Sequence, residues 1–355
     1  MNDTGTPFRV GLTRDLVTAT GEPSFGVAAL GLLDGAAGVE WEYLPEPADT
    51  LTAADAARYD ALYVAAARVP AAVVSGAGLR VRLIARHGVG FDAVDVPAMT
   101  AAGVLVTNTP DAVRRPVATA AFTYVLALAQ KLLIKDQLTR AGRWHERTDH
   151  MGMGLTGRTL GVVGAGSIGQ ETLRLARVFD LQLLAADPYA DPAALAALGA
   201  RLVPLETLLA EADFVCITCA LTPATRHLID AAALARMRRS AYLVNVARGP
   251  VVDEAALVEA LAAGRIAGAG LDVFETEPLP ADHPLLQFPN VIVTPHALCW
   301  TDECFAAIAG SGLASVVDVA QRRLPAHLVN PDVLGHPRIR AWFDTAHGGR
   351  GRLRS

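Results

Sequence analysis

The chain has 355 residues, of which 52% are apolar and 19% are charged. This composition is too apolar for an intrinsically disordered chain, and the length predicts two domains at the usual ~150 residues each. The formal net charge is only −5 and the basic residues are spread along the chain, so neither nucleic acid nor a membrane surface is indicated as a partner.

The termini and the cysteines indicate a cytoplasmic protein. The first residues contain neither the basic region nor the apolar core of an export signal, and the most apolar stretch, residues 117–129, is too short to span a bilayer. Four cysteines are too few for a disulfide framework. Cys216 and Cys219 form a CxxC pattern, but they lie in a predicted strand, where this spacing points side chains to opposite faces and favours a structural role. The histidines lack metal-ligand spacing, so no metal is predicted.

Up to about Asn108, short apolar runs alternate with Ala-rich segments of helical character. This alternation predicts a parallel sheet covered by helices. The predicted strands are residues 8–13, 39–43, 61–66, 81–87 and 103–108. A helix is then predicted over residues 117–134, followed by a polar connector.

A second and clearer series of strands and helices begins at Arg158. Its strands are almost continuously apolar, which is typical of a parallel sheet buried on both faces. They are residues 159–164, 181–187, 213–219, 241–247, 266–274 and 290–296. Helices are predicted between them, for example over residues 167–179, 205–212 and 253–264. After His296 the chain is predicted to be helical again to about Arg323.

These break points predict an α/β protein in which one domain occupies the middle of the chain. The N- and C-terminal pieces then form the other domain together. We place the pieces of the outer domain at residues 1–110 and 299–335, and the central domain at residues 111–298. Residues 336–355, in which arginines stand among Gly, His and Ser, are predicted to be a flexible polar tail.

Three glycines at the start of the second series, Gly164, Gly166 and Gly169, form a GxGxxG pattern. The pattern is weak alone, but here it follows an apolar strand and opens a helix, as a dinucleotide site requires. The first glycine permits a tight turn, the second lets the backbone approach a pyrophosphate, and the third allows close packing of helix and strand. The N-terminus of the helix offers its N–H groups to the phosphates.

Asp187 stands at the end of the next predicted strand, about twenty residues after the glycines. A carboxylate at this place accepts hydrogen bonds from a ribose diol and repels a 2′-phosphate. The pattern therefore predicts a dinucleotide cofactor and favours NAD over NADP.

Arg248, Glu277 and His296 each follow a predicted strand, where open α/β sheets bind their ligands. Arginine presents a planar fork that suits a carboxylate. Histidine is suited to proton transfer near neutral pH, and a neighbouring carboxylate orients its ring and raises its pKa. The three side chains together predict an acid–base site for a carboxylate-bearing substrate.

The chain resembles the D-isomer-specific 2-hydroxyacid dehydrogenase family from about Phe8 to about Leu334. The most specific stretches are residues 161–169, 244–261, 268–278 and 291–296. The resemblance implies a Rossmann-type nucleotide-binding domain inserted in a smaller, flavodoxin-like α/β substrate domain. It also implies a homodimer, with NAD and a small 2-hydroxy or 2-oxo acid bound in a cleft between the domains.

The resemblance also implies roles for individual residues. Arg248 would bind the carboxylate of the substrate and polarise its carbonyl, and His296, paired with Glu277, would give or take the proton. The backbone N–H groups of Val89 and Gly90 would meet the same carboxylate. Asp272 would bind the nicotinamide carboxamide. The cofactor-contacting positions would be Gly164, Gly166, Ser167, Ile168, Gly169, Asp187, Ala247, Arg248 and Asp272.

The chain departs from the family pattern in three places. Thr218 and Ala220 replace a frequent His-x-Pro, and Thr119 replaces a usual glutamate. After the histidine, where glycines are common, the chain has Ala297, Leu298, Cys299 and Trp300. These bulkier residues leave the identity of the 2-oxo acid open.

Further residues near the predicted substrate loop allow two interpretations each. His87 is either a contact for the far end of the substrate or a core histidine, and the core interpretation is favoured. Arg80, Arg82 and Arg86 either bind a phosphate or, as favoured, are solvated surface charges.

Two other functions compete with the dehydrogenase. Related formate dehydrogenases need no proton transfer and carry glutamine where this chain has Glu277, which argues against them. Some relatives are corepressors that sense NAD(H) without turnover, and an intact Arg248, Glu277 and His296 does not exclude such a scaffold.

Overall fold

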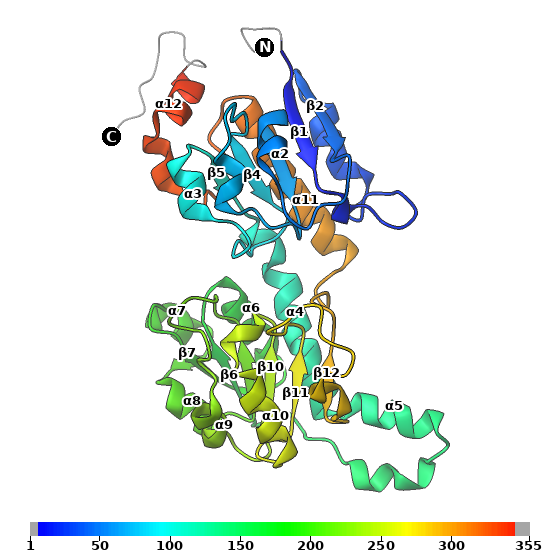
Figure 1. Cartoon of the computed structure of the whole chain (residues 1–355). Helices are drawn as coiled ribbons and strands as arrows, with labels where there is room; N and C mark the ends of the chain where they lie inside the picture. The colour runs from blue at the N-terminus through cyan, green and yellow to red at the C-terminus, as the bar shows by residue number, and fades with distance from the viewer. Residues whose placement is uncertain (1–5, 345–355) are drawn as a thin grey trace. The chain divides into compact units, whose positions relative to one another are not determined.

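Two separate sheets organise the chain in this computed structural model, which describes residues 6–344. Unit 1 consists of Met1–Val113 and Thr301–Ser355, and unit 2 consists of Arg114–Trp300 (Figure 1). The first unit is therefore built from both ends of the chain, and the second from one continuous segment.

Unit 1 contains five parallel strands in the order β2-β1-β3-β4-β5, the flavodoxin-like arrangement. The strands are β1 (Phe8–Leu12), β2 (Val39–Tyr43), β3 (Ala61–Val64), β4 (Leu83–Arg86) and β5 (Leu105–Thr107). All five lie within the predicted strands, which confirms the α/β prediction for this part of the chain. The sequence pattern finds them because their side chains are mostly buried on both faces of the sheet.

Helices cover both faces of this sheet. On one face α11 (Asp302–Ala320) packs with α1 (Gly31–Asp34), η2 (Val27–Leu30) and α12 (Pro337–Asp344), and on the other lie α2 (Ala53–Arg58), η3 (Ala71–Val74) and α3 (Val96–Ala101). Short helices η1 (Arg14–Leu16) and η7 (Pro331–Gly335) complete the unit.

Among the residues that the structure describes, two helical regions are apolar enough, by length and composition alone, to cross a membrane: α11, and the bent pair of α4 (Pro110–Ala129) and α5 (Leu132–Arg140). The apolar residues of α11, among them Leu313 and Val316, are buried in the core of unit 1. Packing against the sheet therefore accounts for the apolar character of this helix.

The prediction of a flexible tail from residue 336 is wrong for residues 337–344, which form α12. Ile339 and Phe343 are buried in the core of unit 1, and the Arg338 guanidinium donates hydrogen bonds to the carbonyl oxygens of Arg80 (2.7 Å) and Gly103 (2.9 Å). Only two apolar residues of this segment, Ile339 and Phe343, are buried in the core, and polar residues surround them in the sequence. The sequence pattern therefore does not predict the helix. The rest of the predicted tail, residues 345–355, lies outside the described residues.

Unit 2 contains seven parallel strands in the order β12-β11-β10-β9-β6-β7-β8, which is the Rossmann arrangement with one further strand. The strands are β6 (Thr159–Val163), β7 (Gln182–Ala186), β8 (Ala200–Leu202), β9 (Phe214–Ile217), β10 (Tyr242–Asn245), β11 (Gly268–Leu271) and β12 (Val291–Val293). On one face lie α4, α6 (Ser167–Arg177) and α7 (Pro192–Ala197), and on the other α8 (Leu205–Glu211), α9 (Ala231–Arg236) and α10 (Glu254–Ala262). Short helices η5 (Gly249–Val251) and η6 (Pro284–Gln287) lie in its loops.

The last residues of six strands pair across the sheet of unit 2. This row is Ala186, Val163, Ile217, Asn245, Leu271 and Val293. The segments that leave the row carry all the predicted site residues of unit 2. Parallel pairing in this register therefore brings distant parts of the sequence to one edge of the sheet.

The predicted helix over residues 117–134 is also corrected. Instead of one helix there are α4 and α5, separated by Lys131 in the left-handed conformation (φ +51°). The predicted polar connector contains a further short helix, η4 (Trp144–His150). A lysine carries no sequence signal for a left-handed turn, so the break is not visible in the pattern.

Candidate functional site

The turn from β6 into α6 depends on two glycines for its shape. Gly164 has a φ of +94°, and a Cβ there would lie 2.5 Å from Cα of Cys219. A Cβ on Gly169 would lie 2.1 Å from the carbonyl oxygen of Gly164. Any side chain at either position would collide with backbone, so the fold itself requires both glycines.

Gly166 differs from these two, because a Cβ there would meet no protein atom within 4 Å. It is the N-cap of α6 and makes no side-chain cap. The next residues, exposed Ser167 and half-buried Ile168, begin the helix. The first N–H groups of a helix have no partner within it and lie at its positive end, so this turn suits a pyrophosphate.

Asp187, directly after β7, faces the same turn. Its Oδ2 accepts a hydrogen bond from the N–H of Ala165 (2.8 Å), and its Oδ1 accepts one from the N–H of Tyr189 (2.8 Å). Each oxygen of Asp187 accepts only one of these hydrogen bonds and has two lone pairs, so both retain capacity for ribose hydroxyls. The carboxylate is thus oriented by the glycine turn that would hold the phosphates.

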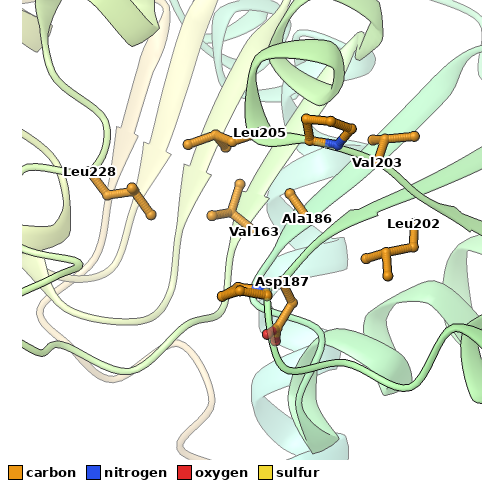
Figure 2. Close-up of a pocket in the computed structure, with 9 residues that line it drawn as sticks. Val163, Ala186, Asp187, Leu202, Val203, Leu205 and Leu228 are labelled. Atoms are coloured by element: carbon orange, nitrogen blue, oxygen red, sulfur yellow. The ribbon is translucent and has the colours of Figure 1, made fainter.

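A cavity of about 460 Å³ adjoins Asp187. Its walls are mainly apolar, and Figure 2 shows the Asp187 carboxylate pointing away from the aliphatic side chains. The lining residues are Val163, Ala186, Asp187, Pro188, Leu202, Val203, Pro204, Leu205 and Leu228. An apolar slot with a carboxylate at its edge suits a planar base joined to a ribose. The lining residues around Leu202 carry no clear sequence signal, because β8 has only three residues.

The loop after β10 places Arg248. Asn245, the last residue of the strand, accepts a hydrogen bond from the N–H of Ala247 (3.0 Å) and donates one to the carbonyl of Arg248 (3.0 Å). A Cβ on Gly249 would lie 1.9 Å from the carbonyl carbon of Phe274. Gly249 therefore lets the Arg248 loop pack directly on the backbone that leads to Glu277.

Glu277 and His296 are brought together by the loops after β11 and β12. The Nδ1 atom of His296 lies 2.9 Å from Oε2 of Glu277, while Oε1 accepts a hydrogen bond from the N–H of Phe274 (3.0 Å). Because Nδ1 is engaged by the carboxylate, Nε2 is the ring nitrogen that remains for a substrate. The pair has the geometry of an acid–base group with an oriented ring.

The electrostatics of the pair follow from these contacts. The hydrogen bond to Glu277 raises the pKa of His296 above its ordinary value, and this effect outweighs burial of the ring. Burial opposes ionisation of Glu277, but the hydrogen bonds from His296 and Phe274 outweigh it and lower the pKa of the carboxyl. The positive charge of Arg248 makes a smaller contribution to each group. It lowers the pKa of Glu277 further and reduces the rise in the pKa of His296. The pair therefore favours a protonated histidine beside an ionised glutamate.

Asp272 is buried, with 4% of its surface exposed, and holds the loop that contains His296. Its Oδ1 accepts hydrogen bonds from the Thr294 hydroxyl and from the N–H groups of Ala297 (2.9 Å) and Leu298 (3.2 Å). Its Oδ2 has a single, longer contact, to the N–H of Leu298 (3.4 Å). The family resemblance implies only a contact with the cofactor for Asp272, and no sequence signal indicates its hydrogen bonds to the segment that contains His296.

Val89 and Gly90 lie in the loop after β4 of unit 1. The side-chain amide of Asn108 donates to the carbonyl of Val89 (2.8 Å), and Nε of Arg86 donates to the carbonyl of Gly90 (3.2 Å). Both carbonyls are thus held by side chains of unit 1. This arrangement fixes the backbone of the loop and leaves the N–H groups of Val89 and Gly90 for a ligand.

Two departures from the family pattern have local partners. The Thr218 hydroxyl donates to the carbonyl of Gly164 (2.6 Å) and so braces the glycine turn. The Thr119 hydroxyl donates to the carbonyl of Arg115 (2.9 Å), one turn back in α4.

The structure supports the core interpretation of His87. Its ring packs against Phe25, Tyr63 and Phe305, and Nδ1 lies 2.5 Å from the Tyr63 hydroxyl. Burial lowers the pKa of His87 to about 3, so the ring is neutral at physiological pH.

The interpretation of the neighbouring arginines as solvated charges is wrong. Arg80 and Arg82 both pair with the buried carboxylate of Asp60, at 2.6 Å and 2.5 Å, and Arg86 is itself buried. Arginine is matched to a carboxylate by its planar fork, so these side chains brace unit 1.

The two cysteines of the CxxC pattern pack with the cores on opposite faces of the sheet, as predicted, although Cys219 lies two residues beyond the end of β9. Cys216 belongs to the core on the α4 and α6 face, and Cys219 packs with the core on the α8 and α9 face. Burial raises the pKa values of their thiols to about 12 and about 11, so neither is a reactive thiolate. Within residues 6–344, no group of three or more His, Cys, Asp or Glu side chains is placed to hold a metal ion.

Comparison with known proteins identifies the relatives of this chain. Residues 122–297 match the family described as D-isomer specific 2-hydroxyacid dehydrogenase, NAD binding domain. A glyoxylate reductase of Korarchaeum cryptofilum is 40% identical over 266 residues, which cover 74% of this chain and 80% of that protein. A D-3-phosphoglycerate dehydrogenase of Mycobacterium bovis is 41% identical over 83% of this chain, and the match spans only 54% of that longer protein. The crystal structure of the TT0316 protein of Thermus thermophilus superimposes with a TM-score of 0.79 at 33% identity, covering 90% of this chain and 99% of that one.

The glycine turn yields a test that separates packing from ligand binding. Gly166→Ala should leave the thermal unfolding temperature unchanged, because its Cβ meets no protein atom, but should weaken NADH binding by about tenfold or more by blocking the phosphate approach. Gly169→Ala should lower the free energy of unfolding by about 1–3 kcal/mol, because its Cβ collides with backbone. Calorimetry and fluorescence titration with NADH measure the two effects, and equal destabilisation by both variants would contradict the assignment.

Proposed function

Because the chain belongs to the D-isomer specific 2-hydroxyacid dehydrogenase family, we propose that it reduces glyoxylate and related small 2-oxo acids to D-2-hydroxy acids with NADH. The observation that carries the proposal is the Glu277–His296 pair at the end of the strand row that also leads to Arg248. The glyoxylate reductase relative supports a small 2-oxo acid as the substrate.

The chain is an NAD-dependent oxidoreductase, and its residues fit the cofactor. We assign the pyrophosphate to the N–H groups at Gly166, Ser167 and Ile168, and the adenosine to the cavity beside Asp187. The Asp187 carboxylate disfavours a 2′-phosphate, which selects NADH over NADPH. Oδ2 of Asp272 is the oxygen assigned to the nicotinamide carboxamide, since Oδ1 already accepts three hydrogen bonds. Ala247 completes the set as a further contact to the cofactor.

When bound, NADH supplies the hydride that the carbonyl carbon of the 2-oxo acid accepts. In this proposal the Arg248 guanidinium binds the carboxylate of the 2-oxo acid and polarises its carbonyl oxygen. His296 holds a proton on Nε2 and passes it to that oxygen, and Glu277 stabilises the protonated ring beforehand. The backbone N–H groups of Val89 and Gly90 are assigned to the substrate carboxylate.

The competing functions find less support. Formate oxidation transfers no proton, so it does not require a histidine whose pKa is raised by a neighbouring carboxylate, as that of His296 is by Glu277. The relatives described above are named as a reductase and a dehydrogenase, which does not favour an NAD-sensing scaffold.

The first test of the proposal is oxidation of NADH, followed by absorbance, over a panel of 2-oxo acids that includes glyoxylate, hydroxypyruvate and larger aliphatic acids. We expect turnover that is fastest with the smallest acids and slower with NADPH. His296→Gln should lower kcat by about 100-fold or more, because general acid catalysis contributes at least this much, and should retain NADH binding. Binding of NADH without turnover of any panel member would overturn the proposal.

The raised pKa of His296 predicts the pH dependence of reduction. The reaction uses the protonated ring, so kcat/KM should be constant at low pH and fall by about tenfold per pH unit above the pKa of His296. Glu277→Gln removes the carboxylate that raises this pKa, so the fall should begin at lower pH. A pH profile that does not move in the Glu277 variant would show that the pair does not set the titration.

We also propose that the enzyme is a cytoplasmic homodimer. Its four cysteines are free thiols, in keeping with a reducing compartment. Figure 1 shows α5 and the segment after it projecting from the rest of unit 2. Large apolar side chains are exposed there, among them Leu132 (56%), Trp144 (63%) and Met151 (74%). An apolar projection of this kind suits burial against a second copy of the chain.

Sedimentation or light scattering tests the dimer. The wild type should have twice the 37.2 kDa mass of one chain, and Leu132→Asp with Trp144→Ser should give monomers, because two apolar contacts are lost from the interface. Val27→Asp, at an exposed apolar position of unit 1, is the matched control and should remain dimeric. Dimers of the double variant, or a monomeric wild type, would contradict the assignment of this surface.

A further inference from the structure

Tyr124 of α4 is a fully buried tyrosine that lies against the strand leading to the candidate site. Only 1% of its surface is exposed. A Cβ on Gly270 of β11 would lie 2.5 Å from its ring, so the absence of a side chain at Gly270 gives the ring its place on the sheet. The ring is therefore held in a fixed position, with its hydroxyl directed past β11 toward the end of β12.

The hydroxyl of Tyr124 is the first member of a chain of hydrogen bonds. Its oxygen lies 2.5 Å from the hydroxyl oxygen of Thr294, and Thr294 in turn donates to Oδ1 of Asp272. A carboxylate only accepts, so the hydrogen of Thr294 points to Asp272. Tyr124 must therefore be the donor to Thr294, and the direction of the whole chain is fixed.

The chain of hydrogen bonds ends on the segment that contains His296. Asp272 accepts from the N–H groups of Ala297 and Leu298, and Thr294 accepts from the N–H of His296 at its carbonyl (3.0 Å). His296 itself has a φ of +54°, a left-handed conformation that a non-glycine residue adopts only at a cost. Contacts on both sides of the residue thus hold it in this strained conformation.

We propose that Tyr124 is a positioning residue, whose hydroxyl acts through Thr294 and Asp272 to hold His296 in the conformation that meets Glu277. This proposal rests on the proposed role of His296 in proton transfer. Tyr124 does not touch the substrate in this scheme, and its effect passes entirely through Thr294.

The effect on His296 has a readout that packing alone does not move. The charged groups that act on the ring are Glu277, Arg248 and Asp272, and the hydrogen bond to Glu277 is the largest influence. If His296 leaves its conformation, the hydrogen bond to Glu277 weakens, and the pKa of His296 falls toward its ordinary value. A general loss of stability leaves the pKa of the folded protein where it is.

The test compares two variants that each remove one hydroxyl from a buried tyrosine of unit 2. Tyr124→Phe removes the donor to Thr294. Tyr242→Phe is the matched control, because Tyr242 is also buried in the same core, stacks on Phe214 and lies outside the chain of hydrogen bonds. The titration of His296 is followed by NMR of the full-length protein labelled at the histidine Cε1 carbon, with His296→Gln used to assign the signal. Steady-state kinetics and thermal unfolding are measured on the same samples.

We expect Tyr124→Phe to lower the pKa of His296 and to lower kcat by roughly tenfold, with KM and NADH affinity changed less than about twofold, because a misplaced acid slows the chemical step. Tyr242→Phe should change neither the pKa nor kcat. Thr294→Val should have at least the effect of Tyr124→Phe, and the double variant should be no worse than Thr294→Val alone, because the two residues act in series.

An unchanged His296 titration in folded Tyr124→Phe would overturn the proposal, as would additive effects of the two substitutions. A drop in unfolding temperature alone would assign Tyr124 to packing and likewise overturn it. If the wild type turns over no 2-oxo acid, the proposed function fails, while the NMR titration still decides whether Tyr124 positions His296.

Discussion

The parallel register of the seven-stranded sheet is the constraint on which the candidate site depends. Six strands end in one row, so each chain segment that leaves the row starts from the same edge. Gly164, Asp187 and Arg248 are far apart in sequence and come close to this edge for that reason alone. A slip of one residue in any strand would turn its side chains to the other face and move its loop away from the site.

Close backbone contacts then turn this common edge into defined geometry. Gly249 lies on the backbone of Phe274, which brings the Arg248 loop to the segment that carries Glu277. Asp272, which follows β11, accepts hydrogen bonds from backbone N–H groups in the segment after His296, and so links the ends of β11 and β12. Groups outside the Glu277–His296 pair therefore determine where the two side chains lie, as an oriented functional site requires.

The sequence predicts the strands except for the three-residue β8, and it predicts the glycine turn, because buried parallel strands and the GxGxxG turn each impose a strict pattern. It does not reveal features that depend on a single tertiary contact. Lys131 breaks a helix without any turn residue, and α12 is anchored by Ile339 and Phe343 within a polar segment. The prediction that Arg82 is a solvated charge fails for a related reason, since its partner Asp60 is 22 residues away in the sequence and no local spacing indicates the pair.

The division of unit 1 between both ends of the chain has a consequence for biosynthesis. Unit 2 is one continuous segment and can close its core as soon as residue 300 has left the ribosome. Unit 1 cannot, because Leu313 and Val316 of α11 fill the core beneath β1 and β3. One face of its sheet therefore stays uncovered until α11 has also left the ribosome. During that interval the nascent chain exposes the apolar surface that α11 later covers, and exposed surface of this kind promotes aggregation.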